Sequence, residues 1–375
     1  MSAYLDNSAT TKPCTECTDA VVKMMTDNFA NASSLHKAGV NAMKELILSR
    51  NIIADALSCD MSEIFFTSGG TEANNLAVFG SVEANKRKGN KIVTTAIEHE
   101  SILAPCAELE KAGFEIVRLV PNEKGNITPE QIFNAVDDKT ILVSTMYVNN
   151  EVGSILPVET VKDAIKAKNS PALFHTDCVQ AFGKLPVKPS KIKADLLTIT
   201  AHKIHGPKGC GALYIKKGVR IIPRTYGGEQ ESRIRPGTES TPLIAGFAGA
   251  VKALPDLKKQ KSKIAELNAY AKEQLKKIGM VFNSSDEATD YIINAALEGI
   301  RSQTLIQFLS EKGVYVSSGS ACSKGKKSHV LTAMGLQNDI IDSSIRISFS
   351  RYNTKEDIDE LANALNEAKL KLARR

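Results

Sequence analysis

Short apolar runs alternate with amphipathic stretches through the first 250 residues of the chain. Six runs rich in β-branched and aromatic residues predict buried strands: EIFFTS, KIVTTA, FEIVRLV, TILVSTMYV, ALFHTD and DLLTIT. Helix-like stretches separate several of them, for example TEANNLAVFGSVEANKRKG and PVETVKDAIKAKN, in which Pro157 suits a first helical turn. This alternation predicts a mostly parallel sheet covered on both faces, which binds ligands at the carboxyl ends of its strands.

The pattern changes near Leu254 and Pro255, where a long polar helix is predicted to begin. The apolar face of this helix consists of Ile264, Leu267, Ala271, Leu275 and Ile278. A strand-like YIINAAL, a helical SQTLIQFLSEKG and an alternating strand SSIRISFS follow. Thr354 can cap the last helix, whose buried stripe is Ile358, Leu361, Leu365, Ala368 and Leu372. We therefore expect a smaller α+β domain from about residue 255 onward.

The length and composition limit the number of hydrophobic cores and indicate the cellular compartment. With 375 residues, 42% of them hydrophobic, the chain can bury one large core or two ordinary ones. Seven cysteines without a repeated spacing argue against a disulfide scaffold and for a reducing compartment. We see no signal peptide and no apolar stretch near the roughly 20 residues that span a bilayer. The expectation is a soluble, cytoplasmic protein without membrane contacts.

Charge and cysteine spacing argue against two classes of partner. The net charge of +6 is a mild excess, aromatic residues make up 5% and tryptophan is absent. Nucleic-acid binding surfaces interleave basic and aromatic residues, so we expect no direct nucleic-acid binding. The CTEC stretch, Cys14 to Cys17, has zinc-like spacing but no second pair, so we expect no metal and place this stretch in a turn between domains.

The segment FFTSGGTEANN places a strand, two glycines and the start of a helix in succession. Backbone N–H groups around Gly69 and Gly70, together with the partial positive charge of a helix N-terminus, suit an anion such as a phosphate. A tight turn followed by a helix that Thr71 caps would give the same sequence. The segment is neither a Walker loop nor a GxGxxG motif, so both interpretations stay open.

Two further segments place ionisable side chains at the ends of predicted strands. Asp177, in HTDCVQAFGK, could cap a helix, pair with a lysine or hold a protonated ring nitrogen such as that of pyridoxal phosphate. Lys203, in TITAHKIHGPKG, could form a Schiff base because burial favours the neutral amine. An acid, a lysine 26 residues later and an upstream anion cradle together favour a pyridoxal-phosphate site.

With these residues, the sequence closely resembles the cysteine desulfurases of the class V aminotransferase family. The resemblance covers nearly the whole chain and is carried, in order, by YLDNSATT, NASSLHKAG, TSGGTEANN, EHES, VNNEVG, TDCVQAFGK, AHKIHGPKG, RPGTES, SSGSACS and SSIRISFS. It implies an α/β protein of pyridoxal-phosphate fold type I. Residues 15–254 would form a large domain with a mostly parallel seven-stranded sheet, and residues 1–14 and 255–375 a small α+β domain.

The resemblance implies a role for each residue around the cofactor ring. Lys203 would bind pyridoxal 5′-phosphate as a Schiff base and later remove the substrate Cα proton. Asp177 would pair with the pyridine nitrogen, and Gln180 would hydrogen-bond the ring hydroxyl. His99 would stack on the ring and assist proton transfer, while Asn149 would lie against cofactor and substrate.

The resemblance also implies how the phosphate and the substrate are held. Arg346 would bind the substrate carboxylate, which suits its planar guanidinium. Thr238 would reach the phosphate of the neighbouring subunit, so a homodimer is expected. Within one subunit, the phosphate would be held by Gly70, Thr71, Thr200 and His202.

The segment SSGSACSKGKKSHVL surrounds Cys322 with serine, glycine and lysine, where no apolar group could bury a thiol. A surface cysteine among solubilising lysines is one interpretation. The resemblance implies the other, in which Cys322 takes sulfur from L-cysteine as a persulfide and L-alanine is released. The nearby Lys324, Lys326 and Lys327 would favour the thiolate, and the small flanking residues would let the loop deliver the sulfur.

Alternatives to a cysteine desulfurase stay open at this point. A selenocysteine lyase or another class V aminotransferase would share the site, although an aminotransferase has no use for Cys322. A non-catalytic scaffold of the same fold would not need Lys203 and Asp177. For the leading hypothesis, the expected partners are L-cysteine and a sulfur acceptor, either an iron–sulfur scaffold or a tRNA or cofactor thiolation enzyme.

Overall fold

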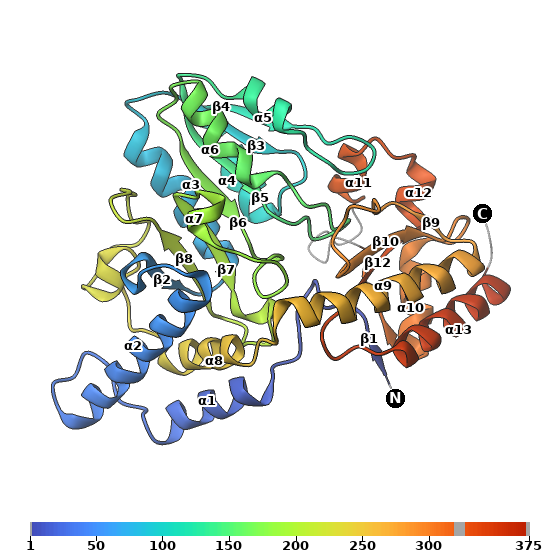
Figure 1. The fold of residues 1–375 in the computed structure, drawn as a ribbon, viewed down its shortest axis with the longest axis horizontal. Coiled ribbons are helices and arrows are strands. Elements are labelled where there is room, and N and C mark those ends of the chain that lie inside the picture. Colours follow the sequence, from blue (N-terminus) through green and yellow to red (C-terminus); the bar gives the residue numbers. More distant parts are fainter. Residues whose placement is uncertain (1, 319–326, 373–375) are drawn as a thin grey trace.

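The chain folds into two lobes that lie side by side (Figure 1). The structure is a computed structural model that describes residues 2–318 and 327–372. The larger lobe contains a seven-stranded sheet in the order β2-β8-β7-β6-β5-β3-β4. Its strands are β2 (Ile64–Thr67), β3 (Lys91–Thr95), β4 (Glu115–Leu119), β5 (Thr140–Met146), β6 (Leu173–Asp177), β7 (Leu196–Thr200) and β8 (Gly211–Ile215). The predicted seven-stranded, mostly parallel sheet is therefore confirmed.

The hydrophobic pattern located six of these strands but missed β8. This strand runs antiparallel to both of its neighbours, β7 and β2. Its five residues are buried, yet the apolar run is short and directly follows a glycine-rich turn. Gly211 shows why the strand begins there, because a Cβ at this position would lie 2.8 Å from the backbone of Gly69.

Helices cover both faces of the sheet, as the alternating pattern predicted. Neighbouring strand residues such as Ile92 and Val93 belong to different apolar clusters, because successive side chains of a strand point to opposite faces. The helices α3 (Gly70–Asn85) and α4 (Glu100–Lys111) pack on one face. The other face and the outer edge carry α1 (Thr15–Thr26), α2 (Lys37–Leu57), α5 (Pro129–Ala135), α6 (Val158–Ala167), α7 (Pro189–Ile192) and α8 (Thr241–Lys252).

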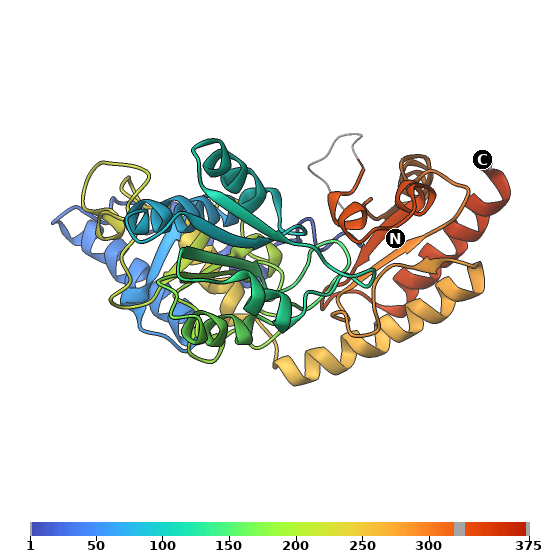
Figure 2. The ribbon, with the colours of Figure 1, turned by 90° about the horizontal axis from the view of Figure 1, so that it is seen from above.

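The smaller lobe combines short sheets with long helices (Figure 2). A three-stranded antiparallel sheet contains β9 (Val281–Phe282), β10 (Ile292–Ala296) and β12 (Ser344–Ser348), and β1 (Ala3–Tyr4) pairs in parallel with β11 (Val314–Tyr315). The helices are α9 (Leu257–Ile278), α10 (Ser302–Glu311), α11 (His329–Ala333), α12 (Asn338–Ser343) and α13 (Lys355–Lys371). All five predicted apolar residues of α9 are buried.

Ala3 and Leu5 belong to the apolar cluster of the smaller lobe, together with residues of α9, β10 and α13. This packing supports the predicted assignment of the N-terminal segment to the small domain, and the boundaries 15–254 and 1–14 with 255–375 stay a prediction. Two helices cross the division, because Val330 and Leu331 of α11 and Ile341 of α12 pack with the cluster of the larger lobe.

Some local predictions need correction. Cys14 and Cys17 lie at the start of α1 and are buried, rather than in a turn between the domains. Pro157 precedes the first turn of α6 instead of lying in it. Within the described residues, no group of three His, Cys, Asp or Glu side chains could hold a metal ion. In that same part of the chain, every helix is too short or too polar to cross a membrane.

Candidate active site

A cavity of about 270 Å³ opens where the carboxyl ends of the parallel strands meet the smaller lobe. The segments that follow β2, β3, β5, β6 and β7 all contribute to its wall, as expected for an open parallel sheet. The lining includes nearly all of the predicted site residues: Gly70, Thr71, His99, Asp177, Gln180, Thr200, His202, Lys203 and Arg346.

Asp177 is the last residue of β6, and its carboxylate is held by two donors. The side-chain amide of Asn74 donates to Oδ2 at 2.7 Å, and the backbone N–H of Val179 donates to Oδ1 at 2.9 Å. Asn74 also donates to the hydroxyl of Ser101 at 2.8 Å. These hydrogen bonds fix the orientation of the Asp177 carboxylate on the cavity wall.

Lys203 follows β7, the strand next to β6 in the sheet. Its ammonium group donates to the backbone carbonyls of Ser8 and, at 2.8 Å, Ala9. Both of these residues belong to the N-terminal YLDNSATT segment and line the cavity. The amine and the carboxylate of Asp177 therefore face the same cavity from adjacent strands.

His99 caps the N-terminus of α4 and fixes its own tautomer in doing so. Its Nδ1 accepts the backbone N–H of Ser101 at 3.1 Å and lies 2.8 Å from the Ser101 hydroxyl. Burial lowers the pKa of His99, and the nearby Lys203 lowers it further while Asp177 opposes the shift. The ring is therefore neutral near pH 7 and carries its proton on Nε2.

The predicted phosphate residues surround the N-terminus of α3. Gly70 is the first residue of this helix, and a Cβ there would lie 3.1 Å from a methyl group of Val179. Thr200 lines the cavity while its hydroxyl donates to the carbonyl of Cys210 at 3.0 Å. Burial, followed by the charge of Lys203, lowers the pKa of His202 to about 3, so His202 is neutral and acts as a hydrogen-bonding group.

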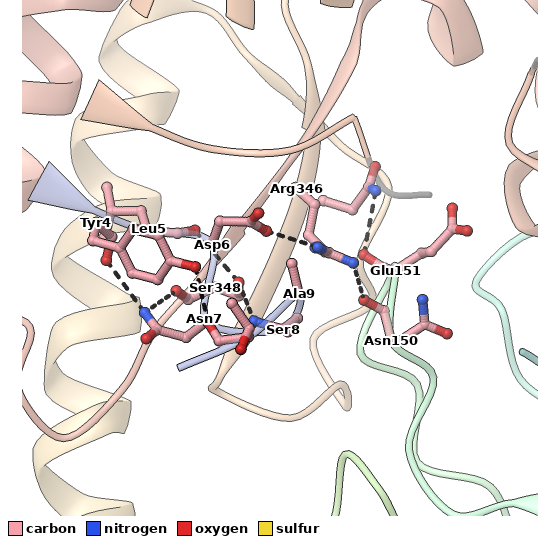
Figure 3. A network of polar contacts seen from close by, with 12 residues as sticks. Tyr4, Leu5, Asp6, Asn7, Ser8, Ala9, Asn150, Glu151, Arg346 and Ser348 are labelled. Atoms are coloured by element: carbon pink, nitrogen blue, oxygen red, sulfur yellow. Dashed lines mark hydrogen bonds and ion pairs between the residues drawn. The ribbon is translucent and has the colours of Figure 1, made fainter. Parts of the chain in front are cut away.

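Arg346 joins the two lobes at the cavity (Figure 3). It lies on β12 and is buried, and its guanidinium donates to the carboxylate of Asp6 at 2.7 Å and to the carbonyl of Asn150 at 2.9 Å. The pairing with Asp6 holds the N-terminal segment against the smaller lobe. The guanidinium is therefore fixed in place on the cavity wall.

Two predicted residues lie outside the cavity lining. The amide of Asn149 holds the turn after β5, since it accepts the N–H groups of Glu151 and Val152 and donates to the carbonyl of Ile97. Asn150 and Glu151 line the cavity in its place. Thr238 is exposed in the segment before α8, and its contact with a neighbouring subunit stays a prediction.

Comparisons with known proteins agree with this geometry. Residues 3–361 match the model of the aminotransferase class-V family. The chain belongs to that family. It is 40% identical over 376 residues to "Cysteine desulfurase IscS" of Methanosarcina thermophila, covering 99% of this chain and 93% of that protein. It is also 40% identical to "Putative cysteine desulfurase IscS 1" of Bacillus subtilis (strain 168), with 96% of each chain covered.

Solved structures give the same result. A "NIFS-LIKE PROTEIN" superimposes with a TM-score of 0.94 at 34% identity, covering 99% of this chain and all of that one. A structure titled "SspA in complex with cysteine" superimposes with a TM-score of 0.84 at 32% identity, covering 94% of this chain and all of that one. The predicted fold type I architecture is therefore confirmed.

Class V aminotransferases depend on pyridoxal 5′-phosphate, and the cavity fits this cofactor. The oriented carboxylate of Asp177 suits a protonated pyridine nitrogen, and the amine of Lys203, which lines the same cavity, could form a Schiff base with the aldehyde. The N-terminus of α3 suits the phosphate, because its N–H groups are accessible where Gly70 lacks a side chain. The donor set thus matches the ring, the aldehyde and the phosphate of the cofactor.

The described residues on either side of residues 319–326 contact the cavity wall, whereas Cys322, Lys324 and Lys326 lie outside the described residues. On one side, Ser317 and Arg346 exchange backbone hydrogen bonds. On the other side, the Ser328 hydroxyl donates to the buried carboxylate of Glu151 at 2.5 Å. The ammonium group of Lys327, which was predicted to favour the Cys322 thiolate, donates to Oδ1 of Asn338 at 2.8 Å.

Several cavity residues were not assigned from the sequence, among them the four polar residues Asn74, Ser101, Glu151 and His329. His329, at the start of α11, lines the cavity and hydrogen-bonds the carbonyl of Glu98 through Nε2 at 2.9 Å. Asn74, Ser101 and Glu151 line the cavity as well. Asn74, Ser101 and Glu151 lie within the motifs TSGGTEANN, EHES and VNNEVG, respectively. Polar residues within these motifs were therefore the signal in the sequence that could have identified them as site residues.

Glu98 is a buried carboxyl group directly before His99. Its Oε1 accepts the Thr95 hydroxyl and the Met146 N–H, each at 2.8 Å, while Oε2 has no hydrogen-bond partner among the described residues. Burial raises the pKa of Glu98 to about 8, and Asp177 adds to the shift. The native protein therefore holds a proton on Glu98 at neutral pH.

We expect Glu98→Gln to gain stability relative to wild type as the pH rises. Between the unfolded pKa of 4.5 and the folded pKa of about 8, the native protein holds a proton that the unfolded chain releases, so wild-type stability falls over this window. The variant lacks this loss, which amounts to a few kcal/mol in order of magnitude. Urea unfolding from pH 5 to pH 9 measures it, with Glu123→Gln in an exposed turn as control. A pH-independent difference would contradict the assignment.

Proposed function

We propose that the protein is a pyridoxal-phosphate-dependent cysteine desulfurase that converts L-cysteine to L-alanine and transfers the sulfur to Cys322. The proposal rests on the contacts of Ser317 and Ser328, which flank the segment that contains Cys322, with Arg346 and Glu151 on the wall of the cavity that Asp177 and Lys203 also line. The names of the relatives support the same activity.

The residues of the chain divide the work of this reaction. The cofactor, when bound, supplies an electron sink for the substrate Cα. Lys203 removes the Cα proton, and Arg346 holds the substrate carboxylate. The Cys322 thiolate attacks the substrate sulfur, so that an S–S bond forms and the C–S bond breaks. The electron pair of the C–S bond stays with the carbon, which is protonated to give alanine.

His99 and Asn149 keep supporting roles in this proposal. The neutral ring of His99 would stack on the cofactor and offer its Nε2–H to the reacting groups, since its Nδ1 accepts the N–H of Ser101. Asn149 acts through the turn that it holds, which places Asn150 and Glu151 on the cavity wall. Gln180 would donate to the ring hydroxyl, and Gly70, Thr71, Thr200 and His202 would hold the phosphate.

We expect Arg346→Ala to raise the KM for L-cysteine roughly 10- to 100-fold, because a charge-assisted hydrogen bond to the carboxylate is lost. The visible spectrum of the bound cofactor should change little. Steady-state alanine formation measures KM, and Arg346→Lys, which keeps the charge but not the planar fork, should lie between wild type and the alanine variant. A wild-type KM in Arg346→Ala would remove Arg346 from the substrate site.

A homodimer is part of the proposal. Large exposed apolar side chains are concentrated in α1, α2 and the segment between them: Val22, Met25, Phe29, Leu35, Val40, Ile47 and Leu48. Such a surface supports an interface. Thr238 is exposed and available to complete the phosphate site of a second subunit. Sedimentation of the cofactor-loaded protein at the mass of a monomer would contradict this state.

The sulfur acceptor and the location follow from the same chemistry. A persulfide on Cys322 would pass its sulfur to an iron–sulfur scaffold or to a tRNA or cofactor thiolation enzyme. All six described cysteines are free, which supports a reducing, cytoplasmic location.

A further inference from the structure

Lys184 is a buried lysine that lies behind the cavity rather than in its wall. Its side chain follows β6 in the turn 178–185, and the residue is 8% exposed. Its ammonium nitrogen donates to Oε1 of Gln180 at 3.0 Å and lies 5.6 Å from the ring centroid of Tyr291. No carboxylate among the described residues forms an ion pair with it. Burial of an amine without a carboxylate partner lowers the free energy of unfolding, so a functional role is a reason for the residue to be there.

The charged groups around Lys184 are cations. Burial lowers the pKa of Lys184 to about 7, and the charges of Lys203 and Arg346 lower it further. The other titratable or charged groups that face it or share its small second cavity are Tyr291, His202, His205 and Arg351. Lys184 and Lys203 both line this second cavity, whereas Gln180 lines the main one. Lys184 therefore reaches the cofactor site through Gln180.

The hydrogen bonds around Gln180 permit only one orientation of its amide. The amine of Lys184 donates to the amide oxygen at 3.0 Å. The backbone carbonyl of Ser8 can only accept, and it lies 2.9 Å from the amide nitrogen. A flipped amide would place its oxygen against the Ser8 carbonyl and its N–H groups against the amine. The second N–H of Gln180 is left for a group in the main cavity.

The same carbonyl of Ser8 also accepts from Lys203. A continuous series of hydrogen bonds thus runs from Lys184 through Gln180 and Ser8 to the lysine that binds the cofactor. Each member is buried or half-buried, where hydrogen bonds are stronger and polarise one another. A change at Lys184 is therefore transmitted to the cofactor without any direct contact.

We propose that Lys184 is a positioning residue, which fixes the amide of Gln180 with its nitrogen toward the ring hydroxyl of the cofactor and so sets the pH at which the bound cofactor changes its protonation. The inference rests on pyridoxal phosphate in this cavity and is independent of which substrate the enzyme uses.

The test compares the visible spectra of wild type, Lys184→Met and Lys184→Arg between pH 6 and pH 10, each loaded with pyridoxal phosphate. The methionine variant is expected to fold, because it removes a buried charge without a carboxylate partner. It should bind the cofactor fully, and its spectral midpoint should rise by about one pH unit, since a fixed hydrogen-bond donor from Gln180 to the ring hydroxyl favours the deprotonated form. Lys184→Arg should stay near the wild-type midpoint.

A second pair of variants tests the route through Gln180. If Lys184 acts through this amide, Lys184→Met should add no further shift in a Gln180→Leu background. Equal shifts in both backgrounds would show that the charge acts directly and would overturn the positioning role. An unchanged midpoint in Lys184→Met alone would overturn the inference altogether. Wild type that binds no cofactor would instead overturn the cofactor site, and this inference with it.

Discussion

Lys203→Ala is expected to lose covalent cofactor attachment and turnover together. The amine of Lys203 faces the cavity between the Ser8 and Ala9 carbonyls, next to the strand that ends in Asp177. Removing it removes both the Schiff base and the group that takes the Cα proton. We expect a rate loss of roughly 10³-fold or more. Absorption spectra and alanine formation from L-cysteine measure the two effects on one sample.

Lys208→Ala is the matched control, because Lys208 is an exposed lysine five residues further along the same segment. It should keep the visible band and the activity of wild type. If Lys203→Ala also keeps the visible band, another lysine binds the cofactor, and the assignment of Lys203 is wrong.

Cys322→Ala is expected to keep the cofactor spectrum and lose sulfur transfer. Ser317 and Ser328, which lie on either side of the segment that contains Cys322, contact Arg346 and Glu151 of the cavity wall, and this supports Cys322 as the proposed nucleophile. We expect alanine formation to fall roughly 10³-fold or more, the scale observed when a covalent nucleophile is removed. Alanine released per unit time reports the loss, and the spectrum reports an intact site.

Cys59→Ala provides the control for loss of a thiol. Cys59 is half-buried, and burial raises its pKa to about 12, so it is protonated and a poor nucleophile near neutral pH. This variant should be as active as wild type. Equal alanine formation by wild type and Cys322→Ala would show that Cys322 is not the sulfur acceptor, although the cofactor site would stand.

The hydrophobic pattern predicted those elements whose burial follows a regular period. β3, β5 and β7 are buried along their whole length, and α9 and α13 carry one apolar face each, so each appears in the sequence as a clear run or stripe. β8 was missed because its start depends on Gly211, where a close approach to the turn after β2 matters more than any period.

The sequence predicted those residues of the candidate site that lie at the ends of the parallel strands. Asp177 and Lys203 follow neighbouring parallel strands, so their approach follows from the order of elements. The support of Asp177 by Asn74 could not be predicted, because it depends on how α3 rotates against the sheet. The exchange of Asn149 for Asn150 in the cavity wall has the same cause, since the turn geometry after β5 decides which amide points inward.

A single-turnover experiment tests the proposed reaction most directly. Protein loaded with pyridoxal phosphate is mixed with one equivalent of L-cysteine, and alanine and the sulfur bound to the Cys322 peptide are both quantified. The proposed reaction predicts equal amounts of alanine and of Cys322 persulfide. Alanine without sulfur on Cys322, or a 2-oxo acid in place of alanine, would contradict it.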